Sequence, residues 1–521
     1  MFQNRYDTDL HEKIAFGINY QRLYLRMEAA SMEDGKRNSR IALTGRIVIP
    51  GDPEYNVARL VSNYYTSKDK FPEVIVYCQN TKDVQNAVIW ARTHKVPIRV
   101  RSGGHNHEAF STGTGVIVID VSEMKEITIN KDEDVATVQP GITGQELYSK
   151  LYEVGLTQVG GTCDEVGFSG LVLTGGMGPL LRKYGLTCDN LLSVNLVDAN
   201  GRLIYATKDN GHKDLFWALQ GGGGGNFGIV TSITIKVYPA TPVTWFNIGW
   251  DWNQPVEKVI DVWQNFFYYA DERWFSHLDL WSKPFPSEEF GKLPLKAMGV
   301  FWGTPEEAKQ ELAPLLYTGQ PSNQTVELVS WDQAIRLFAL SNEIFITEKP
   351  EYKSSGAYAM KRLPPEAIKT IRKTLENTSS PLLNVLIYSL GGAFQKTAPT
   401  ETAFYYRDAE YFIQYYNQWV KDEDASERIH ELELLRRRLL PFTEGDYVGN
   451  PDTAIKDYLT AYYGGNVDRL RCVKRKYDPE NIFHFEQSIP PARKNCNYCN
   501  NLLCTELKGG SKVWINKNPL G

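Results

Sequence analysis

The sequence predicts an α+β protein built from more than one module. Its 521 residues are too many for one simple domain. Strand-like and helix-like runs alternate from about residue 45 to residue 125, as in a βαβ unit. The composition then shifts near Pro239, because residues 240–440 hold nine of the 12 tryptophans and few glycines. That shift predicts a second domain with an aromatic-rich antiparallel sheet, most of whose aromatic side chains form its core.

Composition excludes several function classes. The chain is 42% hydrophobic and 23% charged, which is typical of a globular protein with a sizeable core. A net charge of −5 provides no basic surface for nucleic acid and does not favour an anionic membrane. No run approaches the roughly 20 apolar residues of a membrane helix, and the first residues lack a signal peptide's apolar core. We therefore expect a cytoplasmic protein without nucleic-acid or membrane partners.

The elements can be predicted in chain order. Residues 1–44 are expected to form an N-terminal extension with a short strand near Phe16 and a helix turn near Met27. Beyond it, apolar runs predict strands and amphipathic runs predict helices. The strands are expected at 73–77, 97–100, 115–121, 136–139, 192–197, 203–206 and 229–237, and the helices at 81–94, 144–153, 214–220 and 467–476.

Two glycine-rich stretches are the candidate binding segments. The first follows a predicted strand and reads Arg101-Ser102-Gly103-Gly104-His105-Asn106-His107. Paired glycines let backbone N–H groups point at one anion, although a single histidine after such a turn is more often structural. The second, 159–190, carries Cys163 and has too many glycines for a good helix or strand. Such backbone suits close packing against a flat or phosphorylated ligand.

A third glycine run, 221–225, matches neither common nucleotide pattern. No Lys-Ser/Thr pair follows it, which excludes a P-loop. A strand rather than a helix follows it, which makes it a poor dinucleotide fingerprint. The tail, 492–521, contains Cys496, Cys499 and Cys504. A structural zinc site needs four ligands, so we expect free thiols or one disulfide and no metal.

Five separated motifs in this order resemble the berberine bridge enzyme-like flavoproteins, which belong to the vanillyl-alcohol-oxidase type of FAD-linked oxidases. The resemblance covers roughly residues 45–491. It implies a two-part FAD-binding domain of the PCMH type, formed by 45–239 and by a C-terminal segment, 441–491, that returns to it. Residues 240–440 are then the substrate domain, with an antiparallel sheet covered by helices.

The resemblance also implies the position of the cofactor. The histidine directly after the paired glycines, His105, and the cysteine of the second stretch, Cys163, are the family's two covalent attachment points for FAD. This chain has Asp164 where the family usually has proline. Because a thiolate attacks more readily than a thiol, the site is expected to lower the pKa of Cys163. The other residues expected around the flavin are Arg101, Ser102, Gly103, Gly104, Asn106, His107, Gly161, Thr162, Val166, Gly167, Gly170, Gly175, Gly176, Gly178, Tyr184, Gly185, Asp189, Asn190, Gly228, Ile229, Val230, Tyr463 and Asn466.

By the same resemblance, the function is that of an alcohol oxidase. Tyr447 matches the family's catalytic base and Tyr388 the residue that helps it ionise; the alternative for both is a buried core tyrosine. A valine at position 166, three residues after Cys163, resembles members that reduce O₂ to H₂O₂. The expected substrate is a small molecule: a sugar, an oligosaccharide or a hydroxylated natural product. An FAD dehydrogenase with another acceptor and a non-catalytic flavoprotein scaffold remain alternatives, and the sequence leaves the substrate and oligomeric state open.

Overall fold

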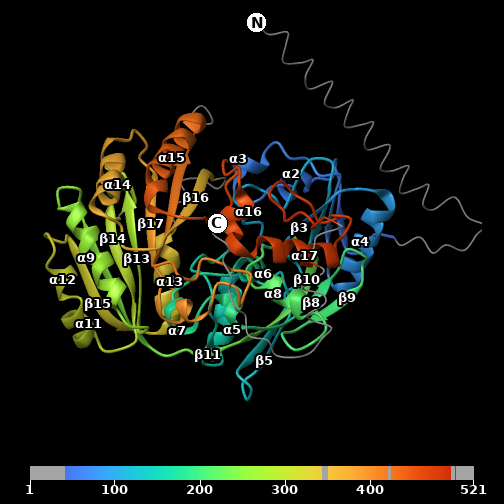
Figure 1. The fold of residues 1–521 in the computed structure, drawn as a ribbon, viewed down its shortest axis with the longest axis horizontal. Coiled ribbons are helices and arrows are strands. Elements are labelled where there is room, and N and C mark those ends of the chain that lie inside the picture. The colour runs from blue at the N-terminus through green and yellow to red at the C-terminus, as the bar shows by residue number, and fades with distance from the viewer. Residues whose placement is uncertain (1–41, 291, 343–349, 421–423, 494–498, 500–521) are drawn as a thin grey trace, which may run out of the picture.

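The computed structural model describes residues 42–290, 292–342, 350–420, 424–493 and residue 499 (Figure 1). The predicted strand and helix turn of residues 1–40 lie outside these residues. Figure 1 shows one half of the molecule built on a large sheet, which has seven strands, and another half that contains both the N-terminal elements and the red C-terminal helices.

The first sheet is small and mixed. Its strand order is β1-β2-β4-β3, with β4 parallel to both β2 and β3 and with β1 antiparallel to β2. Helix α4 packs beside it and begins at its cap residue Asn80, whose side chain accepts hydrogen bonds from two backbone N–H groups. The elements are β1 (Arg46–Val48), α2 (Tyr55–Ala58), α3 (Tyr64–Ser67), β2 (Val74–Tyr77), α4 (Thr81–His94), β3 (Ile98–Arg101) and β4 (Ile117–Asp120).

The second sheet is antiparallel, with the order β5-β6-β10-β8-β9. Its strands are β5 (Ile127–Asn130), β6 (Val135–Val138), β8 (Leu191–Val197), β9 (Leu203–Ala206) and β10 (Ile229–Lys236). The helices of this part are α5 (Gly144–Tyr152), α6 (Phe168–Thr174), α7 (Leu181–Tyr184), η1 (Thr187–Asn190) and α8 (Lys213–Leu219). A two-stranded ladder of β7 (Leu156–Thr157) and β11 (Tyr238–Pro239) leads into the next sheet.

The prediction that the second glycine-rich stretch contains no regular helix is wrong for α6, which includes Gly170. Its apolar side chains Phe168, Val172 and Leu173 are buried in the core beside the five-stranded sheet. Burial of this face outweighs the helix-breaking tendency of one glycine. The expected strand 229–237 and helix 214–220 correspond to β10 and α8 within one residue at each end.

The third sheet has seven antiparallel strands in the order β15-β12-β14-β13-β17-β18-β16. They are β12 (Val243–Trp250), β13 (Trp274–Trp281), β14 (Leu295–Phe301), β15 (Asn323–Val329), β16 (Glu351–Ala359), β17 (Leu383–Ser389) and β18 (Tyr411–Trp419). The helices between and after them are α9 (Val256–Tyr269), α10 (Ser287–Phe290), α11 (Pro305–Glu311), α12 (Ala313–Leu316), α13 (Trp331–Asn342), α14 (Pro365–Asn377), η2 (Gly392–Lys396) and α15 (Ala425–Leu439).

The two faces of this sheet have different partners. On the outer face, apolar residues of α9, α12, α14 and α15 share one core with alternate residues of the strands. This arrangement is the predicted antiparallel sheet covered by helices. The inner face packs against α5, α7 and η1, and residues from both halves share a second core there. A cavity lies where these halves meet.

The chain then returns to the first half through η4 (Leu440–Phe442), α16 (Tyr458–Tyr463), η5 (Gly464–Asn466) and α17 (Val467–Tyr477). Lys474 of α17 is fully buried, and its Nζ donates to the carbonyl oxygens of Asn226 and Phe483 and pairs with Asp478 at 2.7 Å. These bonds fasten α17 to the glycine run that precedes β10. Within the described residues, no helix is both long and apolar enough to cross a membrane.

Candidate active site

The cavity between the halves has a volume of about 450 Å³ and is lined by segments far apart in the sequence. One wall is the backbone of the His105 turn, the Cys163 stretch and the glycine run 223–225. The opposite wall is the inner face of the seven-stranded sheet, and the segment 483–487 after α17 completes the lining. The geometry therefore suits a ligand held between a glycine-rich cradle and a sheet of side chains.

The two glycine stretches pack backbone to backbone. A Cβ on Gly103 would lie 2.4 Å from the backbone nitrogen of Gly167, so no larger residue fits there. This contact places His105 and Cys163 on the same cavity wall. The Nε2 atom of His105 lies 3.9 Å from a carboxylate oxygen of Glu165. Burial lowers the pKa of His105 and Glu165 partly opposes this, so near neutral pH the imidazole is uncharged and has a free lone pair.

The pKa of Cys163 differs from the predicted direction. Its side chain is open to the cavity, but the surrounding protein disfavours the thiolate, and the carboxylates of Asp164 and Glu165 disfavour it further. Together they raise the pKa of Cys163 to about 11. The protein by itself therefore does not lower this pKa as expected. Asp164, which stands where the resemblance expects proline, contributes to the difference.

Tyr447 and Tyr388 both line the cavity, and both rings contact Phe412. The hydroxyl of Tyr447 lies 3.1 Å from Thr174 Oγ1 and accepts a hydrogen bond from the backbone N–H of Gly176 at 3.2 Å. Burial raises the pKa of Tyr447 to about 12, although these two hydrogen bonds lower it. Tyr388 lies on β17 beside His277 and Phe412, and burial raises its pKa as well. Within the described residues, no hydrogen bond joins Tyr388 to Tyr447.

Most of the predicted cofactor residues line the cavity. They are Ser102, Gly103, Gly104, His105, Asn106, His107, Gly161, Thr162, Cys163, Val166, Gly167, Gly170, Gly228, Val230 and Tyr463. Ten others do not: Arg101, Gly175, Gly176, Gly178, Tyr184, Gly185, Asp189, Asn190, Ile229 and Asn466.

Four of the ten residues away from the lining make buried contacts within the protein. Arg101 forms a buried ion pair with Asp120, and Asp189 accepts two hydrogen bonds from the guanidinium of Arg407. Gly178 packs against the carbonyl of Gly160, where a Cβ would lie 1.7 Å from the oxygen. Asn466 donates to three backbone carbonyls, including that of Thr402.

Sequence reasoning missed part of the lining. Gly223, Gly224, Gly225 and Asn226 face the cavity, although the run they belong to fits neither nucleotide pattern. The run of glycines was the available signal. At Gly224 a Cβ would meet only Leu173 within 4 Å, so the absence of a side chain leaves open space there. Residues 448–451 and Gln487 also line the cavity.

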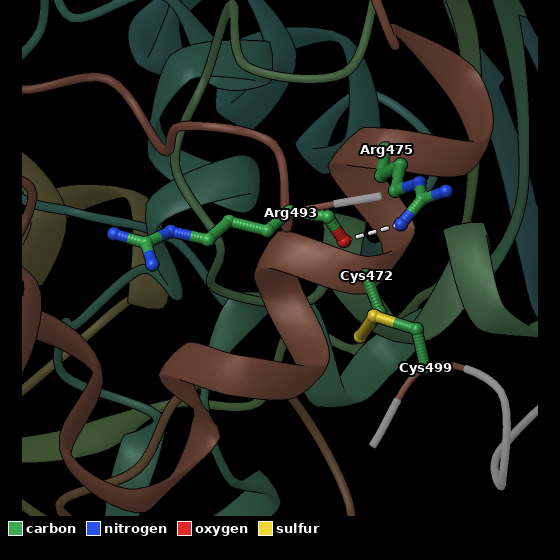
Figure 2. The surroundings of a disulfide bond; sticks show 4 residues. All are labelled: Cys472, Arg475, Arg493 and Cys499. Atoms are coloured by element: carbon green, nitrogen blue, oxygen red, sulfur yellow. Dashed lines mark hydrogen bonds between the residues drawn. A yellow bond between two sulfur atoms is a disulfide. The ribbon is translucent and has the colours of Figure 1, made fainter. Parts of the chain in front are cut away.

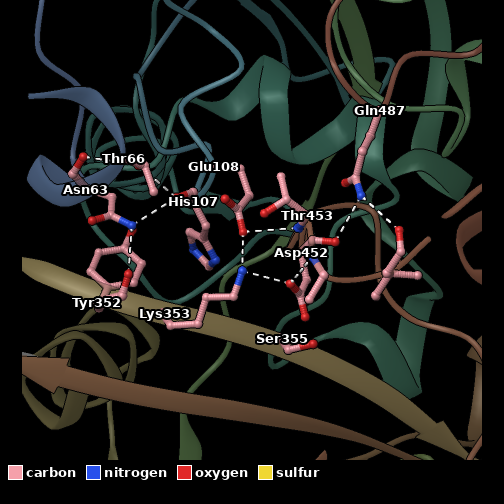
Figure 3. Close-up of polar contacts among 12 residues, drawn as sticks. Asn63, Thr66, His107, Glu108, Tyr352, Lys353, Ser355, Asp452, Thr453 and Gln487 are labelled. Carbon is pink, nitrogen blue, oxygen red and sulfur yellow. Dashed lines mark hydrogen bonds and ion pairs between the residues drawn. The ribbon is translucent and has the colours of Figure 1, made fainter. Parts of the chain in front are cut away.

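A buried ion triad lies beside the cavity (Figure 3). Lys353 of β16 pairs with Glu108, three residues after His105, and with Asp452 at 2.7 Å, five residues after Tyr447. Burial would raise the pKa of Asp452, but its contacts with Lys353 dominate and lower it. The triad thus joins strand β16 of the seven-stranded sheet to the segment that carries His105 and to the segment that carries Tyr447.

Asp446 directly precedes Tyr447 and is fully buried. It accepts hydrogen bonds from the backbone N–H groups of Tyr447 and Gly356, at 2.6 Å and 3.2 Å. Burial nevertheless raises the pKa of Asp446 to about 7, and Asp452 adds to the rise. This carboxyl group therefore titrates near neutral pH beside the candidate base.

The tail is tied to the body of the protein by a disulfide (Figure 2). Cys499 pairs with Cys472 of α17, so of the two expected states, free thiol and disulfide, Cys499 has the disulfide, with a partner outside the tail. Nearby, Arg475 donates to the carbonyl oxygen of Arg493. Cys496 and Cys504 lie outside the described residues, within which no cluster of three or more His, Cys, Asp or Glu side chains could hold a metal.

Comparison with known proteins identifies the family. The FAD-binding-domain family model matches residues 72–207, and the model described as berberine and berberine like matches 446–490. An FAD-linked oxidoreductase of Bacillus subtilis, YgaK, is 42% identical over 456 residues, covering 87% of this chain and 98% of that protein. The chain belongs to the berberine bridge enzyme-like family of FAD-linked oxidoreductases.

Solved structures of this family share the fold. The berberine bridge enzyme-like protein 1 of Physcomitrella patens is 28% identical, with a TM-score of 0.79 over 87% of this chain and 98% of that one. Phl p 4, a grass pollen allergen with glucose dehydrogenase activity, is 25% identical, with a TM-score of 0.77 over 86% of this chain and 97% of that one. An isoleucine-to-valine variant of Phl p 4 is described as a glucose oxidase.

The cavity of this oxidoreductase fits FAD. At Gly170 a Cβ would meet no atom within 4 Å, so bare backbone forms the wall and leaves room for a planar ring. The uncharged imidazole of His105 and the thiol of Cys163 face the same space.

Proposed function

We propose that the protein is an FAD-dependent oxidase whose flavin is bound covalently through His105 and Cys163. It oxidises an alcohol group of a sugar, an oligosaccharide or a hydroxylated natural product and reduces O₂ to H₂O₂. The observation that carries the proposal is the convergence of both attachment residues and both tyrosines on one cavity. Bound FAD supplies the two-electron acceptor.

The protein's part in the reaction is to position the substrate and take its proton. Removing hydride from a carbinol carbon requires that the O–H proton also leave, so a base must lie within hydrogen-bond reach. Tyr447 Oη is that base; the backbone N–H of Gly176 donates to it, and the Thr174 hydroxyl lies within hydrogen-bond distance, so both can stabilise its phenolate. Tyr388, on the facing sheet, binds the same substrate hydroxyl and assists ionisation of Tyr447.

Val166 favours O₂ as the electron acceptor. It lines the cavity three residues after Cys163, where a larger side chain would narrow access. The glucose oxidase activity of the isoleucine-to-valine variant of Phl p 4 supports a role for valine in admitting O₂. The second candidate is a dehydrogenase that uses another acceptor, as Phl p 4 itself has glucose dehydrogenase activity.

The proposal is tested in two steps. First, acid-denatured protein should remain yellow, and its intact mass should exceed that of the chain by about one FAD. His105→Ala and Cys163→Ala should each retain the flavin through the other bond, whereas the double variant should release it. Second, saccharides and hydroxylated natural products should bleach the flavin without air and yield H₂O₂ in air. Bleaching without peroxide would identify a dehydrogenase, and no bleaching by any alcohol would favour a scaffold.

A further inference from the structure

The inner face of the seven-stranded sheet presents side chains to the cavity in rows. Strand register places His277, Tyr388 and Phe412 side by side in a first row, of which Tyr388 and Phe412 line the cavity. The second row, two residues further along each strand, is Asp279, Leu386 and Gln414, and the third is Trp281, Asn384 and Tyr416. Same-face residues repeat about every 7 Å along a strand, so the third row lies about 13 Å from Tyr388.

The second and third rows combine polar and apolar side chains and carry no net charge. Asp279 pairs with Lys296 of β14 at 3.3 Å, and this cation directly opposes it across the strands. Asp279 also accepts hydrogen bonds from Asn384 Nδ2 at 2.6 Å and from Trp281 Nε1 at 2.9 Å. The pairing neutralises the carboxylate and holds Asn384 and Trp281 in fixed positions on the cavity wall.

Two groups in these rows are available to a ligand. The side-chain amide of Asn384 donates hydrogen bonds to Asp279 Oδ1 and to the carbonyl oxygen of Leu280. Its amide oxygen therefore remains as an acceptor for a ligand. The hydroxyl of Tyr416 is buried and has no hydrogen-bond partner among the described residues. Burying such a group without a partner costs free energy, which a ligand hydroxyl can recover.

We propose that the third row forms a distal subsite, reached from the reacting end along the second row, for a neutral, hydroxyl-rich substrate of at least two linked sugar rings. Gln414 contacts the ring that reacts, and Asn384 and Tyr416 contact the next ring. This inference rests on the proposed function, because Tyr388 and Tyr447 define the reacting end. Amide and hydroxyl groups match sugar hydroxyls, and the aromatic side chains of Trp281 and Tyr416, which line the cavity, provide apolar surface for pyranose rings.

The same rows discriminate against other alcohols. An apolar aromatic alcohol would cover the Asn384 and Tyr416 polar groups without bonding to them, which lowers its affinity. An anionic or cationic substrate gains nothing from a carboxylate that Lys296 already neutralises. The rows therefore select substrates by the number of linked sugar rings and by their hydroxyl content.

Anaerobic stopped-flow flavin reduction tests the subsite with glucose, cellobiose and cellotriose, with N-acetylglucosamine and its dimer and trimer, and with cinnamyl alcohol. In the parent protein, the dimer of at least one series should exceed its monomer in the second-order rate constant by about tenfold or more. Asn384→Leu and, as a milder variant, Tyr416→Phe should reduce the dimer's constant about three- to tenfold and leave the monomer's within about twofold. Gln414→Leu should lower the rate constants of both the monomer and the dimer.

Gln324→Leu is the matched control, because it removes an amide from the exposed edge strand β15 of the same sheet. It should change neither rate constant. An equal loss for monomer and dimer in the Asn384 and Tyr416 variants would overturn the subsite, as would an absence of length preference in the parent. Reduction by cinnamyl alcohol but by no saccharide would overturn the subsite and leave alcohol oxidation standing. No reduction by any alcohol would overturn both.

Discussion

Tyr447 is the residue on which the proposed chemistry depends most. Its replacement by phenylalanine keeps the ring and removes only the phenolic oxygen, so the fold and flavin content should survive. A well-placed base contributes roughly 10²- to 10⁴-fold in rate. Anaerobic flavin reduction by substrate should therefore slow by about two orders of magnitude or more.

Tyr406→Phe controls for loss of a nearby buried hydroxyl, because its hydroxyl donates to the carbonyl of Thr460 outside the cavity. Reduction in this variant should stay within a few-fold of the parent rate. If Tyr447→Phe instead matches the parent, the base lies elsewhere. Tyr462 is then the next candidate, since it lines the cavity and its hydroxyl donates to Gln487.

Asp446 should make stability depend on pH between about 4 and 7. An unfolded aspartate has a pKa near ~4, whereas burial raises the pKa of Asp446 to about 7. In this window the folded protein keeps a proton that the unfolded chain has lost, so stability falls as pH rises and levels off above pH 7. Asp446→Asn should remove that fall, which is on the order of a few kcal/mol.

The measurement is the free energy of unfolding at pH 5 and pH 8, because any fixed cost of the amide cancels in the difference. Exposed Asp209→Asn serves as the control and should keep the parent's difference. An unchanged difference in Asp446→Asn would show that this carboxyl group does not titrate in the window.

At the scale of one element, the Cys472–Cys499 disulfide links α17 to the tail across 27 residues. The enclosed loop contains Phe483, His484 and Phe485, which line the cavity. Closing a loop of this length stabilises the fold by roughly 3 kcal/mol. Cys472→Ser with Cys499→Ser should lower the free energy of unfolding by about that amount, while the flavin spectrum stays unchanged.

Reductant should lower the parent's stability to that of the double variant and leave the variant unaffected. Deletion of residues 496–521 removes Cys499, so it should have the same stability cost and the same unchanged spectrum. A variant as stable as the oxidised parent would mean that the bond does not constrain the folded chain.

At the scale of the whole molecule, sequence patterns predicted local elements better than the walls of the site. Helix α4 matches its predicted bounds, because an asparagine cap and amphipathic spacing are local signals. The Gly223–Gly225 wall was missed because its role depends on which segment packs opposite. The rows around Asn384 depend on strand register, and the pairing of Cys499 with Cys472 depends on tertiary proximity. The raised pKa of Asp446 likewise follows from burial, which no motif encodes.

Lys353 links three parts of the molecule. Its ion pairs join the predicted FAD-binding part, the substrate domain and the C-terminal segment. Lys353→Met leaves Glu108 and Asp452 buried together without a cation. Breaking a buried pair from one side costs about 3 to 5 kcal/mol. We expect a loss of that size in the free energy of unfolding at pH 7, with a smaller loss in acid, where protonation relieves the repulsion.

The triple variant Lys353→Met, Glu108→Gln, Asp452→Asn separates charge from packing. It carries no buried charge at this junction, so it should recover much of the stability lost in Lys353→Met. Exposed Lys208→Met is the control for loss of a lysine and should change stability by less than about 0.5 kcal/mol. Equal stabilities of the single and triple variants would show that the cost arises from lost packing. The triad would then not be what holds the three segments in register around the cavity.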